Sequence, residues 1–173
     1  REETVQNSVD EIKAAGGEAL GLAADVQDEG QLKEASDKII DKWGQIDVLI
    51  NAAGGNLPGA TIAPDQTVFD VSVGDLQKVL DLNLMGSVLP TLAFGKTMAD
   101  RKKGSIINIS SMASTHAITR VLGYSMAKAG IDMFTKWMAT EFAQKYGDGL
   151  RVNAIAPGFF ISHQNRRLLT EED

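Results

Sequence analysis

The chain has 173 residues, and its 23 Asp and Glu outnumber its 17 Lys and Arg, which leaves a formal net charge of −6. This acidity argues against a general nucleic-acid binder. Apolar residues make up 43% of the chain and charged residues 23%, proportions that are typical of a globular protein and argue against disorder along the whole chain. The sequence has no cysteine, so disulfides, thiolate metal sites and cysteine nucleophiles are excluded. It has 17 glycines among its 173 residues, a larger share than the usual ~7%.

The ends of the sequence bear on targeting. No stretch reaches the ~18 consecutive apolar residues of a membrane helix, and the first residues form neither a signal peptide nor a methionine start. We therefore expect a cytoplasmic protein without a membrane partner. The first residues already follow a helical pattern, and residues 170–173 stop without a closing element, so we expect the chain to be part of a longer protein.

The first part of the sequence alternates helical patterns with a short apolar run. Val5, Val9 and Ile12 repeat at helical spacing before a pair of glycines, so we expect a helix that ends there. Residues 18–24 predict a short strand. A second helix follows, ending at Gly44, and one of its faces is expected on the core: Leu32, Ala35, Ile39 and Trp43.

Three more short apolar segments alternate with two long helical patterns. The strands are predicted at 46–50, 105–110 and 150–155, and the helices at 73–100 and 123–146, after a small-residue turn at 51–55 and a long loop at 56–72. Strands that are apolar on both faces and alternate with helices are typical of an α/β fold. The pattern therefore predicts a parallel sheet with helices on both sides, in a single domain.

Two candidate sites fail on spacing. Gly95-Lys96-Thr97 resembles the end of a phosphate-binding loop, but Pro90 stands where that loop needs its first glycine. His116 and His163 are far apart in the sequence, and neither has a second ligand at metal-binding spacing. We therefore expect no metal site.

Tyr124 and Lys128 are the strongest candidates for chemistry. They stand four residues apart in a predicted helix, so both side chains leave the same face. Taken alone, the spacing is more typical of an aromatic residue packed beside a solvated lysine. Two strand ends add weight to the functional interpretation, because ligands bind at the carboxyl ends of parallel strands: Ser110-Ser111 and Asn51–Gly54.

With these residues in order, the chain resembles the short-chain dehydrogenase/reductase family over nearly its whole length. The matching motifs are Asp25-Val26, Asn51-Ala52-Ala53-Gly54, Asn83, Ser111, Tyr124 with Lys128, Arg151-Val152-Asn153 and Pro157-Gly158. The resemblance implies a Rossmann-like, doubly wound parallel sheet. It also implies hydride transfer between NAD or NADP and a carbonyl or secondary alcohol.

The resemblance assigns four catalytic residues. A free phenol stays protonated at neutral pH and a neighbouring ammonium favours the phenolate, so Tyr124 would act as acid and base beside Lys128. Ser111 would donate a hydrogen bond to the substrate oxygen, while capping of local backbone fits Ser110 better. Asn83 would distort its helix and hold a water that relays protons to Lys128.

The same resemblance implies the cofactor contacts. They comprise Asp25, Val26, Asn51, Ala52, Ala53, Gly54, Tyr124, Lys128, Pro157, Gly158 and Ser162. Asp25 is equally typical of a helix N-cap, and the small residues of 51–54 suit both a tight turn and the close approach of a cofactor. The family's first strand, its glycine-rich turn and its final closing elements have no counterpart in these residues, so the choice between NAD and NADP stays open.

The substrate segments resemble the D-mannonate oxidoreductase (fructuronate reductase) branch of the family. A sugar acid needs a guanidinium for its carboxylate and polar partners for its hydroxyls. The expected substrate residues are Asn56, Ser111, Met112, Arg120, His163, Asn165 and Arg166. Arg120 and Arg166 are equally typical of solvated loop charges, and gluconate or a 3-oxoacyl carrier are alternative substrates.

Two expectations concern the protein as a whole. Members of the family usually form tetramers through the two long helices, so a homotetramer is expected here. A function of another class, a non-catalytic Rossmann-like binding module, also stays open.

Overall fold

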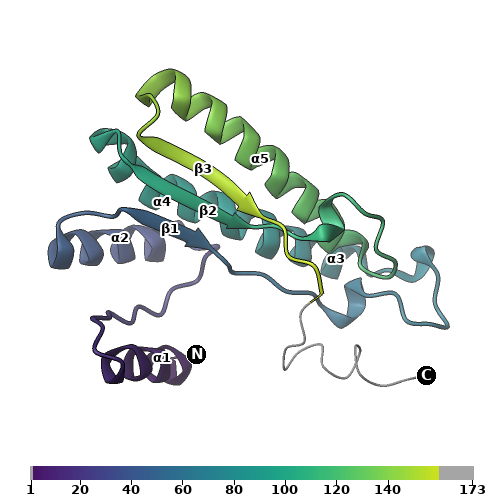
Figure 1. The fold of residues 1–173 in the computed structure, drawn as a ribbon. Helices are drawn as coiled ribbons and strands as arrows, with labels where there is room; N and C mark the ends of the chain where they lie inside the picture. The colour runs from purple at the N-terminus through teal and green to yellow at the C-terminus, as the bar shows by residue number, and fades with distance from the viewer. Residues whose placement is uncertain (1, 160–173) are drawn as a thin grey trace.

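The structure, a computed structural model, describes residues 2–159 (Figure 1). Its strands are β1 (Val48–Asn51), β2 (Gly104–Ile109) and β3 (Leu150–Ile155), and its helices are α1 (Glu2–Ala14), α2 (Glu29–Trp43), α3 (Val73–Leu80), α4 (Gly86–Arg101) and α5 (Leu122–Tyr146). The α/β fold predicted from the sequence is confirmed. Its three strands lie at the apolar runs 46–50, 105–110 and 150–155, to within two residues at each end.

The three strands form one parallel sheet in the order β1-β2-β3. The register aligns Asn51 of β1 with Asn108 of β2, and Ile109 of β2 with Ile155 of β3. All three strand arrows therefore point the same way, toward the end of the molecule where the loops after β1 and β2 gather (Figure 1). This is the Rossmann-like arrangement, and it brings the ends of β1 and β2 side by side.

The strand predicted at 18–24 is wrong, because that run makes no ladder with another strand in the described part of the chain. A β-strand needs a neighbour to take its backbone hydrogen bonds, and apolar composition alone cannot supply one. The run instead packs beside α1, where Gly21 lies so close that an added Cβ would be 2.7 Å from the Val5 side chain. Figure 1 shows α1 apart from the sheet.

Within residues 2–159 the helices α2, α4 and α5 pack on one face of the sheet. Their shared core contains Leu32 of α2, Met98 of α4, Ile106 of β2 and Phe142 of α5. The other face of the sheet carries exposed apolar side chains within these residues: Val48 (54%), Ile50 (59%) and Ile155 (52%).

The helix predicted at 73–100 is interrupted. A π-helical turn, Asp81–Met85, separates α3 from α4. Asn83 lies in this turn, fully buried, and its side-chain amide donates a 2.8 Å hydrogen bond to the carbonyl of Val79, one turn earlier. Single π-helical turns of this kind commonly mark functional positions. The local distortion that the resemblance implies for Asn83 is therefore present.

Helix ends agree with the sequence better than helix faces do. Gly16 and Gly44 adopt positive φ angles of 83° and 76°, as expected of residues that end helices. The N-cap of α2 is Asp28, whose carboxylate accepts from the backbone N–H of Gln31, so the N-cap alternative for Asp25 is wrong. Trp43, predicted on the core, is 41% exposed.

Candidate active site

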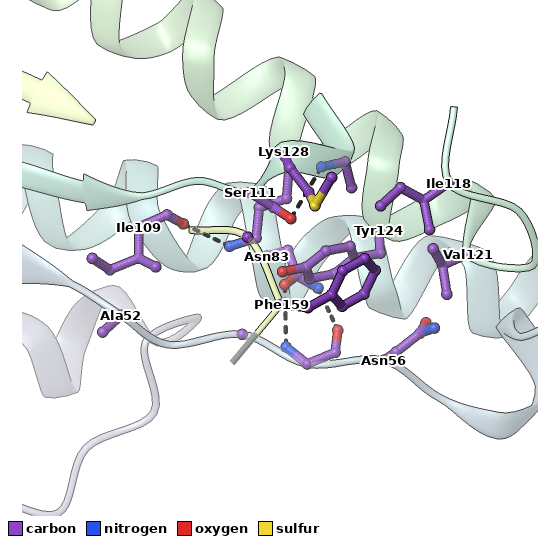
Figure 2. A pocket seen from close by; sticks show the side chains of 15 residues that line it. Ala52, Asn56, Asn83, Ile109, Ser111, Ile118, Val121, Tyr124, Lys128 and Phe159 are labelled. Atoms are coloured by element: carbon purple, nitrogen blue, oxygen red, sulfur yellow. Dashed lines mark hydrogen bonds between the residues drawn. The ribbon is translucent and has the colours of Figure 1, made fainter. Parts of the chain in front are cut away.

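A cavity of about 450 Å³ opens at the carboxyl ends of β1 and β2. Its volume lies in the range of small-molecule sites, roughly 300–1,000 Å³. Predicted residues from five segments line it: Ala52, Gly54, Asn56, Asn83, Ser111, Met112, Tyr124, Lys128 and Gly158. Figure 2 shows Ser111, Tyr124 and Lys128 reaching into this space, with Asn56 on the loop that faces them.

Lys128 is held inside this cavity by α5 and β2. Its side chain is 4% exposed, and its Nζ donates a 2.7 Å hydrogen bond to the carbonyl oxygen of Ile109, the last residue of β2. The same Nζ lies 5.3 Å from the centroid of the Tyr124 ring. Burial lowers the pKa of Lys128, and the negative charge of Asp132 partly opposes that effect. The interpretation of Lys128 as a solvated lysine is wrong.

Of the two serines after β2, Ser111 caps the local backbone and Ser110 does not. Ser111 Oγ accepts a 3.1 Å hydrogen bond from the backbone N–H of Ala113 and caps a short 3₁₀ turn, while it also lines the cavity. Ser110 Oγ is buried and has no hydrogen-bond partner among the described residues, so the capping role predicted for Ser110 is wrong. Because Ser111 uses a lone pair for the cap, its hydroxyl proton stays available to a ligand.

Asn83 ties the π-helical turn to the turn after β1. Its Nδ2 donates to the carbonyl of Gly55 at 2.7 Å, and its Oδ1 accepts from the N–H of Gly55 at 3.1 Å, as Figure 2 shows. An added Cβ at Gly54 would lie 2.6 Å from Asn83 Oδ1. The sequence left a tight turn and a close cofactor as reasons for a small residue here, and the structure adds a third, because Asn83 leaves no room for a Cβ at Gly54.

Asn51 faces the core and not the cavity. Its side chain is 4% exposed, and its Nδ2 donates to Thr91 Oγ1 at 2.9 Å and to Asn108 Oδ1 at 2.8 Å. Asn108 in turn donates to Thr135 Oγ1 at 2.9 Å. This buried network joins β1, α4, β2 and α5, so the Asn51 side chain holds together the elements that carry the site. Its predicted cofactor contact is limited to the backbone.

The other predicted cofactor residues lie outside the cavity wall. Asp25 is exposed, and its Oδ1 accepts from the backbone N–H of Gln27. Val26 packs against Gly86 at the start of α4, where an added Cβ would be 3.0 Å away. Ala53 and Pro157 are not lining residues either, although the carbonyl of Pro157 accepts from the N–H of Met112. Ser162 lies outside the described residues.

The predicted substrate residues divide in the same way. Asn56 lines the cavity and donates a 2.8 Å hydrogen bond to Thr61 Oγ1, and Met112 lies nearby in the wall. Arg120 is not a lining residue, because its Nε donates to the carbonyl of Ile62 at 2.7 Å, on the neighbouring loop. A direct contact between Arg120 and the substrate therefore stays a prediction. His163, Asn165 and Arg166 lie outside the described residues.

Residues 2–159 contain neither a metal-binding cluster nor a membrane-spanning helix. No group of three or more His, Asp or Glu side chains there is arranged to hold a metal ion. In the same range, no helix combines the length and apolar character needed to cross a membrane. Neither finding adds a second candidate site to the cavity.

The geometry agrees with what comparison with known proteins finds. The family model of the short chain dehydrogenases matches residues 1–173. The chain belongs to the short-chain dehydrogenase family. An oxidoreductase of Bacillus subtilis that is itself uncharacterized, UxuB, is 43% identical over 97% of the chain. A 3-oxoacyl-[acyl-carrier-protein] reductase of Synechocystis is 39% identical over 94% of the chain.

A solved structure extends the comparison to three dimensions. It is that of a Haemophilus influenzae protein named provisionally as a D-mannonate oxidoreductase, with bound NAD. Its TM-score is 0.90 at 38% identity, and the match covers 99% of this chain and 64% of that one. The chain spans 62% of the length of both the B. subtilis and the Synechocystis relatives.

This short-chain dehydrogenase also has cavity residues that the sequence did not single out. They are mostly apolar: Gly55, Ile109, Ala113, Ile118, Val121 and Phe159. Gly55 directly follows Gly54 and Phe159 directly follows Gly158, and such proximity in the chain was the only sequence signal for these residues. The buried network was missed as well, although an asparagine inside the strand 105–110 is unusual enough to have indicated it.

Proposed function

We propose that the protein transfers a hydride between NAD(P)(H) and a carbonyl or secondary alcohol of a sugar acid of the D-mannonate/D-fructuronate type. The observation that carries the proposal is that Ser111, Tyr124 and Lys128 share one cavity at the carboxyl ends of the strands. Ser111 is held by its bond to Ala113 and Lys128 by its bond to Ile109, and the Tyr124 ring lies beside the Lys128 ammonium, so the three side chains form a built arrangement.

The residues would divide the work of carbonyl reduction. When bound, NAD(P)H would supply the hydride for the carbonyl carbon, and the electron pair of the C=O π bond would move to oxygen. The hydroxyl of Tyr124 gives its proton to that oxygen, and the nearby Lys128 ammonium stabilises the phenolate left behind. The Ser111 hydroxyl donates a hydrogen bond to the same oxygen. Alcohol oxidation runs these steps in reverse.

The cavity suits the nicotinamide end of the cofactor. It combines an apolar wall, for example Ile109 and Val121, with the hydroxyls of Ser111 and Tyr124 and the ammonium of Lys128. An apolar pocket with a few convergent polar groups is the usual form of a cofactor site. Of the three N–H donors of the Lys128 ammonium, one donates to Ile109, so the other two are available for a ribose hydroxyl.

Two observations bear on the substrate. The Asn56 amide in the cavity wall suits a polyhydroxylated ligand, and the solved relative named for D-mannonate supports a sugar acid. The apolar side chains of Ile118, Val121 and Phe159 favour a second candidate, a 3-oxoacyl group, which is what the Synechocystis relative is named for.

A substrate panel tests the proposal. The full-length protein is mixed with NADH or NADPH and, separately, D-fructuronate, 5-ketogluconate or an acetoacetyl thioester, and cofactor oxidation is followed by absorbance. We expect the highest kcat/KM with a keto sugar acid. Preference for the thioester would replace the sugar acid by the second candidate, and no turnover with any carbonyl would favour a non-catalytic binding module.

We also propose that residues 1–173 form part of one Rossmann-fold domain that assembles as a homotetramer through α4 and α5. Exposed apolar side chains on these helices support the assembly: Leu92 (59%), Met133 (63%) and Trp137 (60%). Light scattering of the full-length protein and of Trp137→Glu tests it. A monomeric wild type would contradict it.

A further inference from the structure

Two loops border the outer part of the cavity, and one arginine joins them. The backbone N–H of Ile62 donates a 2.9 Å hydrogen bond to the carbonyl of Arg120. In return, Nε of Arg120 donates a 2.7 Å hydrogen bond to the carbonyl of Ile62. The two bonds form a closed pair between residues that are 58 positions apart in the sequence.

The backbone of Arg120 is held in an unfavourable conformation. Its φ is 73°, in the left-handed region that side-chain-bearing residues rarely adopt. Among the described residues other than glycine, only Lys102 shares a positive φ, and Lys102 ends the helix α4, where such an angle is common. Arg120 ends no helix, so its contacts with Ile62 are what the structure offers to compensate the strain.

The residues beside this pair form opposite walls of the cavity. Val121 directly follows Arg120, and both it and Ile118 line the cavity. On the other side, Thr61 directly precedes Ile62 and accepts a hydrogen bond from the Asn56 amide, which also lines the cavity. Thr61 Oγ1 donates in turn to the carbonyl of Leu57. Each wall is thus connected to the pair through one or two residues.

We propose that Arg120 is a positioning residue that latches the loop 115–121 to the loop 56–63 and thereby sets the width of the substrate end of the cavity. The inference rests on the proposed function, because it concerns the same site. It gives Arg120 a role in substrate selection without contact between its guanidinium and the substrate.

Hydrogen exchange tests the latch without any substrate. In the full-length protein, Arg120→Gly keeps the positive φ available but removes the side-chain bond, and Arg120→Ala removes the bond and leaves the strain. Both variants should exchange the amide of Ile62 faster than the wild type. Arg101→Ala is the matched control. The Arg101 guanidinium also donates to a backbone carbonyl, that of Ile46, and neither of these two residues lines the cavity. Arg101→Ala should leave exchange at Ile62 unchanged.

Steady-state kinetics separate the latch from a carboxylate-binding arginine. A latch predicts that Arg120→Ala raises KM by a similar factor, roughly tenfold as for one lost charged hydrogen bond, for a keto sugar acid and for the same keto sugar without its carboxylate. It also predicts no rescue by Arg120→Lys, whose ammonium lacks the Nε geometry. Unchanged exchange at Ile62, together with a KM effect confined to the carboxylated substrate, would overturn the proposal. If the wild type reduces no sugar acid, the proposed function fails, and the exchange experiment still decides on the latch.

Discussion

The Lys128 ammonium donates a 2.7 Å hydrogen bond to the carbonyl oxygen of Ile109. This bond ties the first turns of α5 to the end of β2, the same strand that leads into Ser111. It also directs the ammonium to within 5.3 Å of the centre of the Tyr124 ring. The position of Lys128 is therefore set by the protein before any ligand enters, which is how a catalytic group is preorganised.

The burial of Lys128 predicts a pH-dependent stability difference. Its pKa is lowered, so the folded protein binds this proton less tightly than the unfolded chain does. The resulting penalty on folding is complete below the lowered pKa and disappears as the pH rises toward the ordinary value of 10.5. In urea unfolding, the stability of Lys128→Met relative to the wild type should be highest at neutral pH and fall toward pH 10.5. The exposed Lys136→Met is the control, and a pH-independent difference for Lys128→Met would contradict the assignment.

The close approach of Gly54 to Asn83 predicts a steric effect. An alanine Cβ at position 54 would lie 2.6 Å from Asn83 Oδ1, which is held by its bond to Gly55 and cannot move freely. Gly54→Ala should therefore lower the free energy of unfolding by about 1–3 kcal/mol, as overpacking does. An added Cβ at Gly55 meets no atom within 4 Å, so Gly55→Ala is the matched variant. Equal losses in the two variants would show that Asn83 is not the cause.

The buried network predicts that Asn108 contributes to stability. Asn108→Ala removes its bonds to Asn51 and Thr135 in a region without solvent, at a cost of about 2 kcal/mol or more. Thermal and chemical unfolding measure the loss. Asn153→Ala, on the exposed side of β3, should change stability by less than about 0.5 kcal/mol. A comparable loss of stability in Asn153→Ala would show that the buried network contributes no more to stability than an exposed asparagine does.

The two neighbouring serines predict opposite outcomes. Ser111→Ala loses a hydroxyl that lines the cavity, and kcat should fall by roughly 10²-fold, as for the loss of one donor to a developing oxyanion. Ser110 Oγ is buried without a partner in residues 2–159, so Ser110→Ala should leave kcat unchanged and keep or slightly raise stability. Activity assays and thermal unfolding of the two variants measure both effects, and a larger kcat loss in Ser110→Ala would reverse the assignment.

Local patterns predicted the fold where local physics decides it. The strand 150–155 was predicted at its observed bounds, and the helix end at Gly44 followed from the conformational freedom of glycine. The strand at 18–24 failed because a strand depends on a distant pairing partner, which no local pattern reveals. The exposed face of β1 escaped prediction for the same reason: which side of a sheet is covered depends on elements elsewhere in the chain.

The candidate site shows the same division. Tyr124 and Lys128 could be placed together because helical spacing is a local rule, and the cavity contains both. The capping by Ser111 and the pairing of Arg120 with Ile62 could not, because each depends on atoms whose positions only the folded chain sets. Arg120 carries the charge that a sugar acid requires, and charge alone did not reveal that its Nε is already bonded.

The substitution Tyr124→Phe tests the central claim most directly. It removes one oxygen from the cavity and leaves the ring beside Lys128 in place. In the full-length protein, kcat/KM for carbonyl reduction should fall by roughly 10²-fold or more, the contribution expected of a general acid. Fluorescence titration should show NAD(P)H binding within a few-fold of the wild type. Turnover by Tyr124→Phe at the wild-type rate would contradict the assignment of Tyr124 as the proton donor and, with it, the account of this cavity as the active site.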